Sequence, residues 1–313
     1  MTFCRTLAQL LLTGTIALAS AGITVHDARN RDVAVSDIAR TVSIGGAITE
    51  ILYALGLESR LVGVDTTSLY PAAALHDKPN VGYMRQISAE GVLGLNPTLI
   101  LAIQGAGPRE TMDILETAKV PLVLVPETFS EEGLVEKIRL VGHAMGVDAR
   151  AECLSTAVGA DLAQLRALRA KVTKPVRVMF VMSLQNGRAM VAGHKTAADE
   201  IIQLAGATNA VDDYDGYKII GDEAIVAAKP EFVLSIERGK ESLQADAVYA
   251  HPGFALTPVA ANKSFVTMDG LYLLGFGPRT AAAARDLLVK LYPALADQGG
   301  AFTSALSAAN CRQ

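Results

Sequence analysis

The most constraining feature of the sequence is a long helical stretch that separates two halves of alternating strands and helices. The segment from Asp148 to Lys171 contains Gly159 but no proline, and apolar residues recur at helical spacing along one side. These apolar residues are Leu154, Val158, Leu162, Leu165 and Leu168. At 1.5 Å per residue the helix spans roughly six to seven turns, and Pro175 closes it. We therefore expect two lobes joined by one stiff connecting helix.

Short apolar segments alternate with amphipathic helical segments on both sides of this helix. The predicted strands are residues 41–44, 61–64, 98–103, 121–125, 176–182, 232–236 and 264–268. The predicted helices are residues 47–55, 89–95, 108–118, 130–145, 196–205, 222–228 and 280–291. This order predicts an α/β fold of two doubly wound lobes. The predicted boundaries are an N-terminal lobe at 22–147, the connecting helix at 148–174 and a C-terminal lobe at 175–313.

Two polar segments of the first lobe are expected to be irregular. The segment from His26 to Ser36 is predicted to be a loose lead-in before the first strand. The segment from Asp65 to Asn80 is polar and contains prolines, so we predict a loop there.

The N-terminus has the pattern of a signal peptide covering residues 1–21. A short positive region is followed by an apolar run from Leu7 to Leu18 and by small residues before Gly22, and the run is too short to span a bilayer. Cys4 precedes the apolar run, so it is not a lipid-bearing cysteine and leaves with the signal. The mature chain keeps Cys153 and Cys311. Export permits a disulfide between them, but the position of Cys311 in a terminal tail weighs against it, and the sequence does not decide.

A tyrosine and an arginine stand two residues apart on a predicted turn that runs into a helix. Tyr83 and Arg85 follow Gly82, which loosens the backbone, and Ser88 or Ala89 can start the helix. Loop residues held by rigid elements often bind ligands, so the pair is a candidate site. A surface tyrosine stacked on an arginine is the alternative.

The two lobes repeat a second local arrangement. Glu90 and Glu223 each lie in the first turn of a predicted short helix, seven residues before a proline that precedes a buried strand. Matched exposed acids on two lobes would suit a surface that docks on a partner at two points. The alternative is that each carboxylate only favours a helix N-terminus, worth about 0.3 to 1 kcal/mol.

Composition and motifs exclude several other functions. Of the residues, 50% are apolar and 19% charged, and the net charge is -4, which lacks the basic excess of a nucleic-acid-binding protein. The sequence has no nucleophile elbow, phosphate-binding loop or dinucleotide fingerprint, so no enzyme is predicted. Its five histidines lack the spacing of a metal site.

With its signal peptide, two lobes, lone helix and paired glutamates, the chain resembles the periplasmic substrate-binding proteins of ABC importers for iron complexes and cobalamin. Within that group, the chain closely resembles the haem-binding members at residues 81–85 and 88–91. Further segments match the same members at residues 45–51, 180–183, 192–199 and 273–277. The resemblance covers nearly the whole mature chain and both lobes. It implies a soluble, monomeric periplasmic protein that receives haem from an outer-membrane receptor system and delivers it to an ABC permease and its ATPase.

The resemblance also implies residue roles. Tyr83 corresponds to the tyrosine whose phenolate binds haem iron, Arg85 to the arginine that supports that oxygen, and Glu90 and Glu223 to the glutamates that dock on the permease. Some relatives carry a histidine that helps to bind a second haem, where this chain has Leu184. We therefore expect one haem per protein. A ferric siderophore or cobalamin is the alternative cargo on the same scaffold, and the absence of tryptophan weighs against cobalamin.

The chemistry of ferric haem agrees with these roles. A phenolate oxygen is a known axial ligand of ferric haem, and a nearby guanidinium favours the ionised form of a phenol while staying cationic itself. The haem propionates would need cations at the rim, for which Lys218 beside Tyr217 is the first candidate. Arg188 and Arg238 are further candidates.

Overall fold

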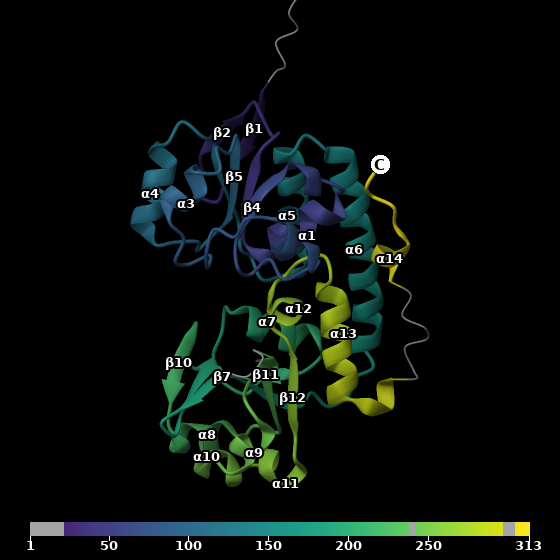
Figure 1. Cartoon of the computed structure of the whole chain (residues 1–313). Helices are drawn as coiled ribbons and strands as arrows, with labels where there is room; N and C mark the ends of the chain where they lie inside the picture. Colours follow the sequence, from purple (N-terminus) through teal and green to yellow (C-terminus); the bar gives the residue numbers. More distant parts are fainter. Residues whose placement is uncertain (1–21, 238–241, 297–303) are drawn as a thin grey trace, which may run out of the picture.

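The computed structural model describes residues 22–237, 242–296 and 304–313. They form two lobes, one above the other in Figure 1, and helix α6 (Asp148–Arg169) runs along one side of both. The predicted signal peptide lies outside the described residues. In the part of the chain that the structure covers, no helix is both long enough and apolar enough to cross a bilayer.

The first lobe is built on a parallel sheet with the strand order β4-β3-β5-β6. Its strands are β3 (Thr41–Ile44), β4 (Leu61–Val64), β5 (Leu99–Ile103) and β6 (Leu122–Val125). Its helical segments are α1 (Gly46–Ala54), η1 (Glu58–Arg60), α2 (Ala73–Asp77), α3 (Ala89–Leu93), α4 (Arg109–Thr117) and α5 (Glu131–Ala144). Every residue of β5 is buried, as predicted for a strand covered on both faces. Leu99, Leu101 and Ile103 of β5 pack toward α1, α5 and α6, whereas Ile100 and Ala102 pack toward α3 and α4.

The second lobe has a mixed sheet with the strand order β10-β8-β7-β11-β12, and β9 also pairs with β7. Its strands are β7 (Arg177–Gln185), β8 (Arg188–Ala192), β9 (Thr208–Asn209), β10 (Tyr217–Ile220), β11 (Phe232–Glu237) and β12 (Phe265–Asp269). Its helical segments are α7 (Ala197–Leu204), α8 (Asp222–Ala228), α9 (Ala245–Tyr249), α10 (Pro252–Ala255), α11 (Pro258–Asn262), α12 (Gly270–Leu274), α13 (Thr280–Leu291) and η3 (Pro293–Leu295). α7 and α13 cover one face of this sheet, and α8 to α11 cover the other.

Helix α6 belongs to the cores of both lobes. Leu154, Val158 and Leu162 pack into the first lobe, and Leu165 and Leu168 pack into the second. The five apolar residues predicted to share one side are therefore all buried. At 1.5 Å per residue the helix is about 33 Å long, so it fixes the separation of the two cores. The fold class, two α/β lobes with one long connecting helix, is confirmed.

The lobes also meet at the segment between α12 and α13. The backbone carbonyl of Phe276 accepts a hydrogen bond from Nζ of the first-lobe residue Lys137 at 3.2 Å, and the ring of Phe276 packs edge-on against Phe129 at 5.2 Å between centroids. Arg279 reaches Glu50 of α1. Figure 1 shows this segment rising from the lower lobe to the underside of the upper one.

The structure corrects several expectations for local segments. The predicted lead-in contains an antiparallel hairpin of β1 (Ile23–His26) and β2 (Asp32–Val35), because Val25 and Val35 are buried against the first-lobe core. The predicted loop 65–80 contains the short helix α2. In the second lobe, β8, β10 and the helices α9 to α11 were not predicted, since they are short segments whose partners are remote in sequence.

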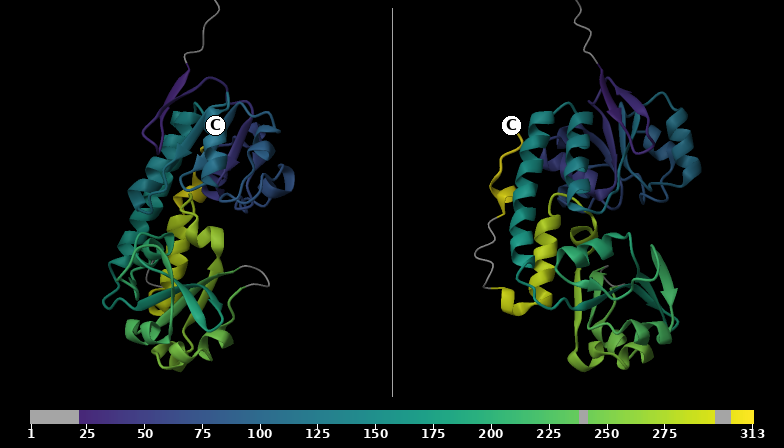
Figure 2. Two further views of the ribbon diagram at one scale, coloured as in Figure 1. Left: turned by 90° about the vertical axis from the view of Figure 1, so that its left-hand side faces the viewer. Right: turned by 180° about the vertical axis from the view of Figure 1, so that it is seen from behind.

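The C-terminal tail packs on the first lobe. The predicted boundaries assign it to the C-terminal lobe. Cys311 forms a disulfide with Cys153 of α6, with 5.6 Å between their Cα atoms, so the structure decides the pairing that the sequence left open. Asp161 of α6 accepts hydrogen bonds from Ser304 and from the backbone at the start of α14 (Ala305–Ala308). The right-hand view of Figure 2 shows this tail lying along α6.

Candidate functional site

The turn that carries Tyr83 and Arg85 lies at the carboxyl edge of the first-lobe sheet. The carbonyl of Gly82 accepts a hydrogen bond from the backbone N–H of Thr66, directly after β4, at 2.9 Å. Met84 and Ile87 are bonded through their backbones to Gly107, in the loop after β5, at 2.9 and 3.0 Å. Two loops that follow β4 and β5, the parallel strands on either side of β3, therefore hold the turn, and ligands of open α/β sheets bind at this edge.

The turn points its two polar side chains outward. Met84, between them, packs on the first-lobe core and Ile87 is buried, whereas Tyr83 is 42% exposed and Arg85 is also exposed. Gly82 has φ +97°, a conformation that suits glycine. Neither polar side chain has a hydrogen bond, an ion pair or a ring contact within the described ranges. The alternative of a tyrosine stacked on an arginine is thus not what the described part of the chain shows, and both groups are available to a ligand.

The remaining tyrosines are poorer candidates for a phenolate. Burial is the first cause that raises the pKa in five of the eight, which disfavours the ionised form. These five are Tyr53, Tyr214, Tyr249, Tyr272 and Tyr292. For Tyr214 burial and Asp213 raise the pKa to about 12. The two remaining tyrosines besides Tyr83 are Tyr217 and Tyr70. The Arg279 guanidinium covers the ring of Tyr70, 3.6 Å from its centroid.

The second-lobe candidates Tyr217 and Lys218 lie on the edge strand β10, directly before α8. Neighbouring residues of a strand point to opposite faces. The ring of Tyr217 packs edge-on against Phe180, 6.3 Å between centroids, whereas Nζ of Lys218 lies 4.5 Å from the ring centroid of Tyr214. Both side chains are exposed. A ligand on one face of this sheet therefore touches Tyr217, and Lys218 reaches it only around the strand edge.

Other second-lobe candidates fall at the β7–β8 hairpin or outside the described residues. Leu184 is near the end of β7, and Arg188 is exposed at the start of β8. Arg238 lies outside the described residues. The two predicted sets lie in different lobes, the Tyr83 turn in the first and β10 in the second.

Glu90 and Glu223 stand at equivalent places in the two lobes. Each is exposed in the first turn of a short helix, α3 or α8, and neither carboxylate has an ion pair in the described ranges. Asn96 and Lys229, the residues directly before the two prolines, both adopt left-handed backbone conformations, with φ 47° and 48°. The sequence repeat is therefore a repeat in three dimensions. In Figure 1 both helices lie on the side of the molecule away from α6.

Sequence reasoning missed an ion pair between the lobes. Arg279, before α13, makes a bidentate pair with the buried carboxylate of Glu50 in α1, at 3.0 and 2.9 Å. The guanidinium also lies between the rings of Tyr70 and Tyr272, at 3.6 and 5.1 Å from their centroids. A glutamate among the apolar residues of the predicted helix 47–55 was the only local signal for this pair, because the partners are 229 residues apart.

The described residues contain no group of three or more histidine, cysteine, aspartate or glutamate side chains that could hold a metal ion. A metal that arrives inside an organic macrocycle already has most of its ligands. One protein ligand from the turn would complete such a site.

The sequence profile of the periplasmic binding protein family matches residues 42–271. The structure is similar to that of the periplasmic haem-binding protein RhuT from Roseiflexus sp. RS-1 in its apo form, with 39% identity and a TM-score of 0.78. The similarity covers 83% of this chain and 100% of that one. It is also similar to the periplasmic haem-binding protein BhuT in complex with two haems, with 39% identity, a TM-score of 0.77, and 82% and 99% coverage.

More distant relatives bear other names. The uncharacterised ABC transporter substrate-binding lipoprotein YvrC of Bacillus subtilis is 26% identical over 87% of this chain and 86% of its own length. The vitamin B12-binding protein of Yersinia pestis (strain Pestoides F) is 26% identical over 79% of this chain and 84% of its own length. The relatives with the higher identity are thus the haem-binding proteins.

Proposed function

Because this chain belongs to the periplasmic binding protein family, we propose that it binds haem in the periplasm and delivers it to an ABC permease for uptake. The observation that carries the proposal is the turn at Tyr83 and Arg85. A half-exposed phenol and an exposed guanidinium stand two residues apart at the carboxyl edge of a parallel sheet, and neither has a partner in the described ranges. The 39% identity with two haem-binding proteins supports the same cargo.

The proposed binding mode uses both lobes. Tyr83 supplies a phenolate oxygen to the ferric iron, and the positive charge of Arg85 stabilises that oxygen. Tyr217 would contact the apolar face of the porphyrin, because its ring is exposed on the same side of the sheet as Phe180. Lys218, at the strand edge, would meet a propionate at the rim.

We propose one haem per protein, although the relative BhuT binds two. The reason is that the chain has Leu184, Gln185 and Asn186 at the end of β7 and its turn, and none of these is a ligand of ferric haem. A titration that reaches its end point at two hemin equivalents would overturn this part of the proposal.

The proposed partners follow from the two matched acids. Glu90 and Glu223 would dock on cationic residues of the permease, whose ATPase drives transport. The proposed route begins with removal of the signal peptide, continues with haem delivered from an outer-membrane receptor system, and uses the protein as a monomer. Its role is transport rather than catalysis.

The decisive experiment is a hemin titration of the mature chain, residues 22–313, and of Tyr83→Phe. The wild type should give a high-spin ferric spectrum with a phenolate charge-transfer band, and Tyr83→Phe should lose that band because it has no oxygen to offer. Tyr70→Phe is a matched control, since Tyr70 is 45% exposed against 42% for Tyr83 and lies in the same connection between β4 and α3. A band that survives in Tyr83→Phe would reject Tyr83 as the ligand.

Vitamin B12, or a ferric siderophore, is the alternative cargo, and the similarity to the vitamin B12-binding protein of Yersinia pestis favours testing it. Equilibrium dialysis with cyanocobalamin should show no binding at concentrations where hemin saturates the protein. Tight binding of cyanocobalamin with no hemin spectrum would replace the proposed cargo.

A further inference from the structure

Most of the exposed large apolar side chains lie in the two segments that the proposed haem would contact. Within the described ranges seven such residues are exposed, and five belong to the loop 65–87 or to β10. These five are Leu69, Tyr70, Tyr83, Tyr217 and Ile219. The other two are Ile114, 54% exposed, and Leu256, 77% exposed. They lie on other elements, one in each lobe, and the ligand site does not account for them.

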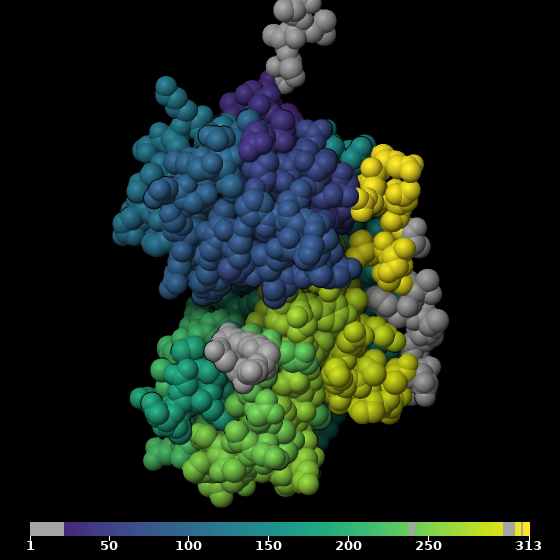
Figure 3. Space-filling model, in the orientation of Figure 1, coloured from purple at the N-terminus to yellow at the C-terminus, as the bar shows by residue number. Residues whose placement is uncertain are grey.

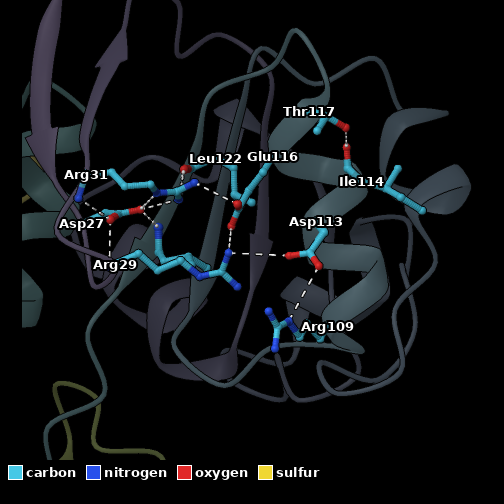
Figure 4. Close-up of polar contacts among 10 residues, drawn as sticks. Asp27, Arg29, Arg31, Arg109, Asp113, Ile114, Glu116, Thr117 and Leu122 are labelled. Atoms are coloured by element: carbon cyan, nitrogen blue, oxygen red, sulfur yellow. Dashed lines mark hydrogen bonds and ion pairs between the residues drawn. The ribbon is translucent and has the colours of Figure 1, made fainter.

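Ile114 lies beside the helix that carries Glu90. Oγ1 of Thr111 in α4 donates a hydrogen bond to the carbonyl of Ile87, just before α3, at 3.2 Å. Ile114 follows Thr111 by three residues, so it lies one turn along the same side of α4. Figure 4 shows the side chain of Ile114 pointing away from the ion pairs that Glu116 makes with Arg29 and Arg31.

Leu256 lies beside the helix that carries Glu223. A Cβ on Gly253 of α10 would come within 3.0 Å of the Cα of Asp222, so α10 contacts the first turn of α8 directly. Leu256 follows Gly253 by three residues, at the C-terminal end of α10. The spacing is the same as in the first lobe: an exposed aliphatic residue lies three positions after the residue that touches the start of the glutamate helix.

We infer that each lobe docks on the permease through an acid and an aliphatic anchor, Glu90 with Ile114 and Glu223 with Leu256. This rests on the proposed function, which supplies the partner. The two carboxylates require a cationic partner, and each exposed aliphatic side chain requires an apolar depression next to that cation. Buried apolar groups supply affinity at such interfaces, whereas the charges guide orientation and association. A permease surface that carries two cationic residues, each next to an apolar depression, would fit both lobes at once.

The test measures docking of the full mature protein, without hemin, on its cognate permease and ATPase complex in nanodiscs. Loss of one exposed aliphatic anchor should weaken docking roughly 10-fold, and the double variant Ile114→Ser/Leu256→Ser should weaken it roughly 100-fold. Ile219→Ser is the matched control for the docking of the apo protein, because Ile219 is 51% exposed but lies on β10. Hemin titration of the double variant should match the wild type, which also shows that the variant is folded.

The outcomes separate the two proposals. Unchanged docking of the double serine variant, with docking lost in Glu90→Gln/Glu223→Gln, would overturn the aliphatic anchors and leave the haem function intact. A wild type that docks but gives no hemin spectrum would overturn the cargo. Equal weakening by Ile219→Ser would show that any loss of apolar surface reduces docking, and it would also overturn the assigned anchors.

Discussion

Two regions join the lobes, and they differ in the contacts that they make. The buried side of helix α6 is mostly apolar and packs into both cores. The segment from Gly275 to Arg279 adds polar contacts with the first lobe to the ring contact of Phe276 with Phe129, namely the ion pair of Arg279 with Glu50 and the hydrogen bond from Lys137 to Phe276. Apolar packing on α6 tolerates small rotations, whereas a bidentate ion pair demands one geometry.

The difference suggests a division of roles between the two regions. α6 sets the separation of the lobes, and the polar segment sets their relative orientation. Both limit the motion that a ligand can cause, so we expect a small closure on binding rather than a large one. The variants below are ordered from the largest expected effect to the smallest, and each weakens or strengthens one of these links.

Arg279→Ala should have the largest effect. It leaves the carboxylate of Glu50, 5% exposed, without its cationic partner and with only the backbone N–H of residue 279, and breaking a buried ion pair in this way costs about 3 to 5 kcal/mol. Urea unfolding monitored by circular dichroism measures the loss. Arg285→Ala is a suitable control, because that arginine lies within α13 and pairs with its half-exposed neighbour Asp286. Equal losses in both variants would contradict a special role for the link between the lobes.

Removal of the disulfide with Cys153→Ser/Cys311→Ser should cost about 2 to 4 kcal/mol, because the bond closes a loop across 158 residues of sequence. The variant and the reduced wild type should unfold at the same urea concentration. The tail of the variant should also become more sensitive to protease, since only non-covalent contacts, the hydrogen bonds to Asp161 and the ion pair of Arg312 with Glu58 among them, then hold it. A tail that stays protected would show that these bonds suffice.

Lys137→Met should cost about 1 to 3 kcal/mol at pH 8, since it leaves the Glu127 carboxylate and the Phe276 carbonyl without their buried donor. Burial raises the pKa of Glu127, and Lys137 opposes that rise. The protonated carboxyl is therefore favoured in the folded state, and its contribution is lost as pH rises through the folded-state pKa. The deficit of Lys137→Met should thus be smaller at pH 5 than at pH 8. Urea unfolding at both values measures it, and a larger deficit at pH 5 would contradict the assignment.

Gly159→Ala should have the smallest effect, and it should be stabilising. A Cβ at this position of α6 meets nothing within 4 Å, and alanine favours a helix interior over glycine by up to about 1 kcal/mol. Gly142→Ala is the opposite control, because its Cβ would lie 2.2 Å from the Cβ of Ala151. A destabilised Gly159→Ala would mean that α6 needs flexibility at this point.

The sequence predicted the regular elements best where their signal is local. The strand Leu99–Ile103, predicted as residues 98–103, is apolar throughout, and the helix Thr280–Leu291 has the bounds that its periodicity predicted. The Tyr83 turn could also be predicted, because Gly82 and the helix start at Ser88 are local signals. The roles of Tyr83 and Arg85 in haem binding remain predictions, as do those of Glu90 and Glu223.

Elements that depend on remote partners could not be predicted in the same way. β10 is four residues long and exists through its pairing with β8, and that pairing places Tyr217 and Lys218 on opposite faces. The pairing of Cys153 with Cys311 depends on where the tail runs, which no local pattern encodes.

By itself the sequence determined two α/β lobes, the helix between them and an outward-pointing tyrosine and arginine on a turn, because periodicity, glycine and capping act over a few neighbouring residues. The tertiary structure alone decided that Arg279 meets Glu50, that the tail returns to the first lobe, and that an aliphatic side chain stands beside each glutamate helix. Such contacts join residues far apart in the chain, and their formation depends on the packing of whole elements rather than on any local propensity.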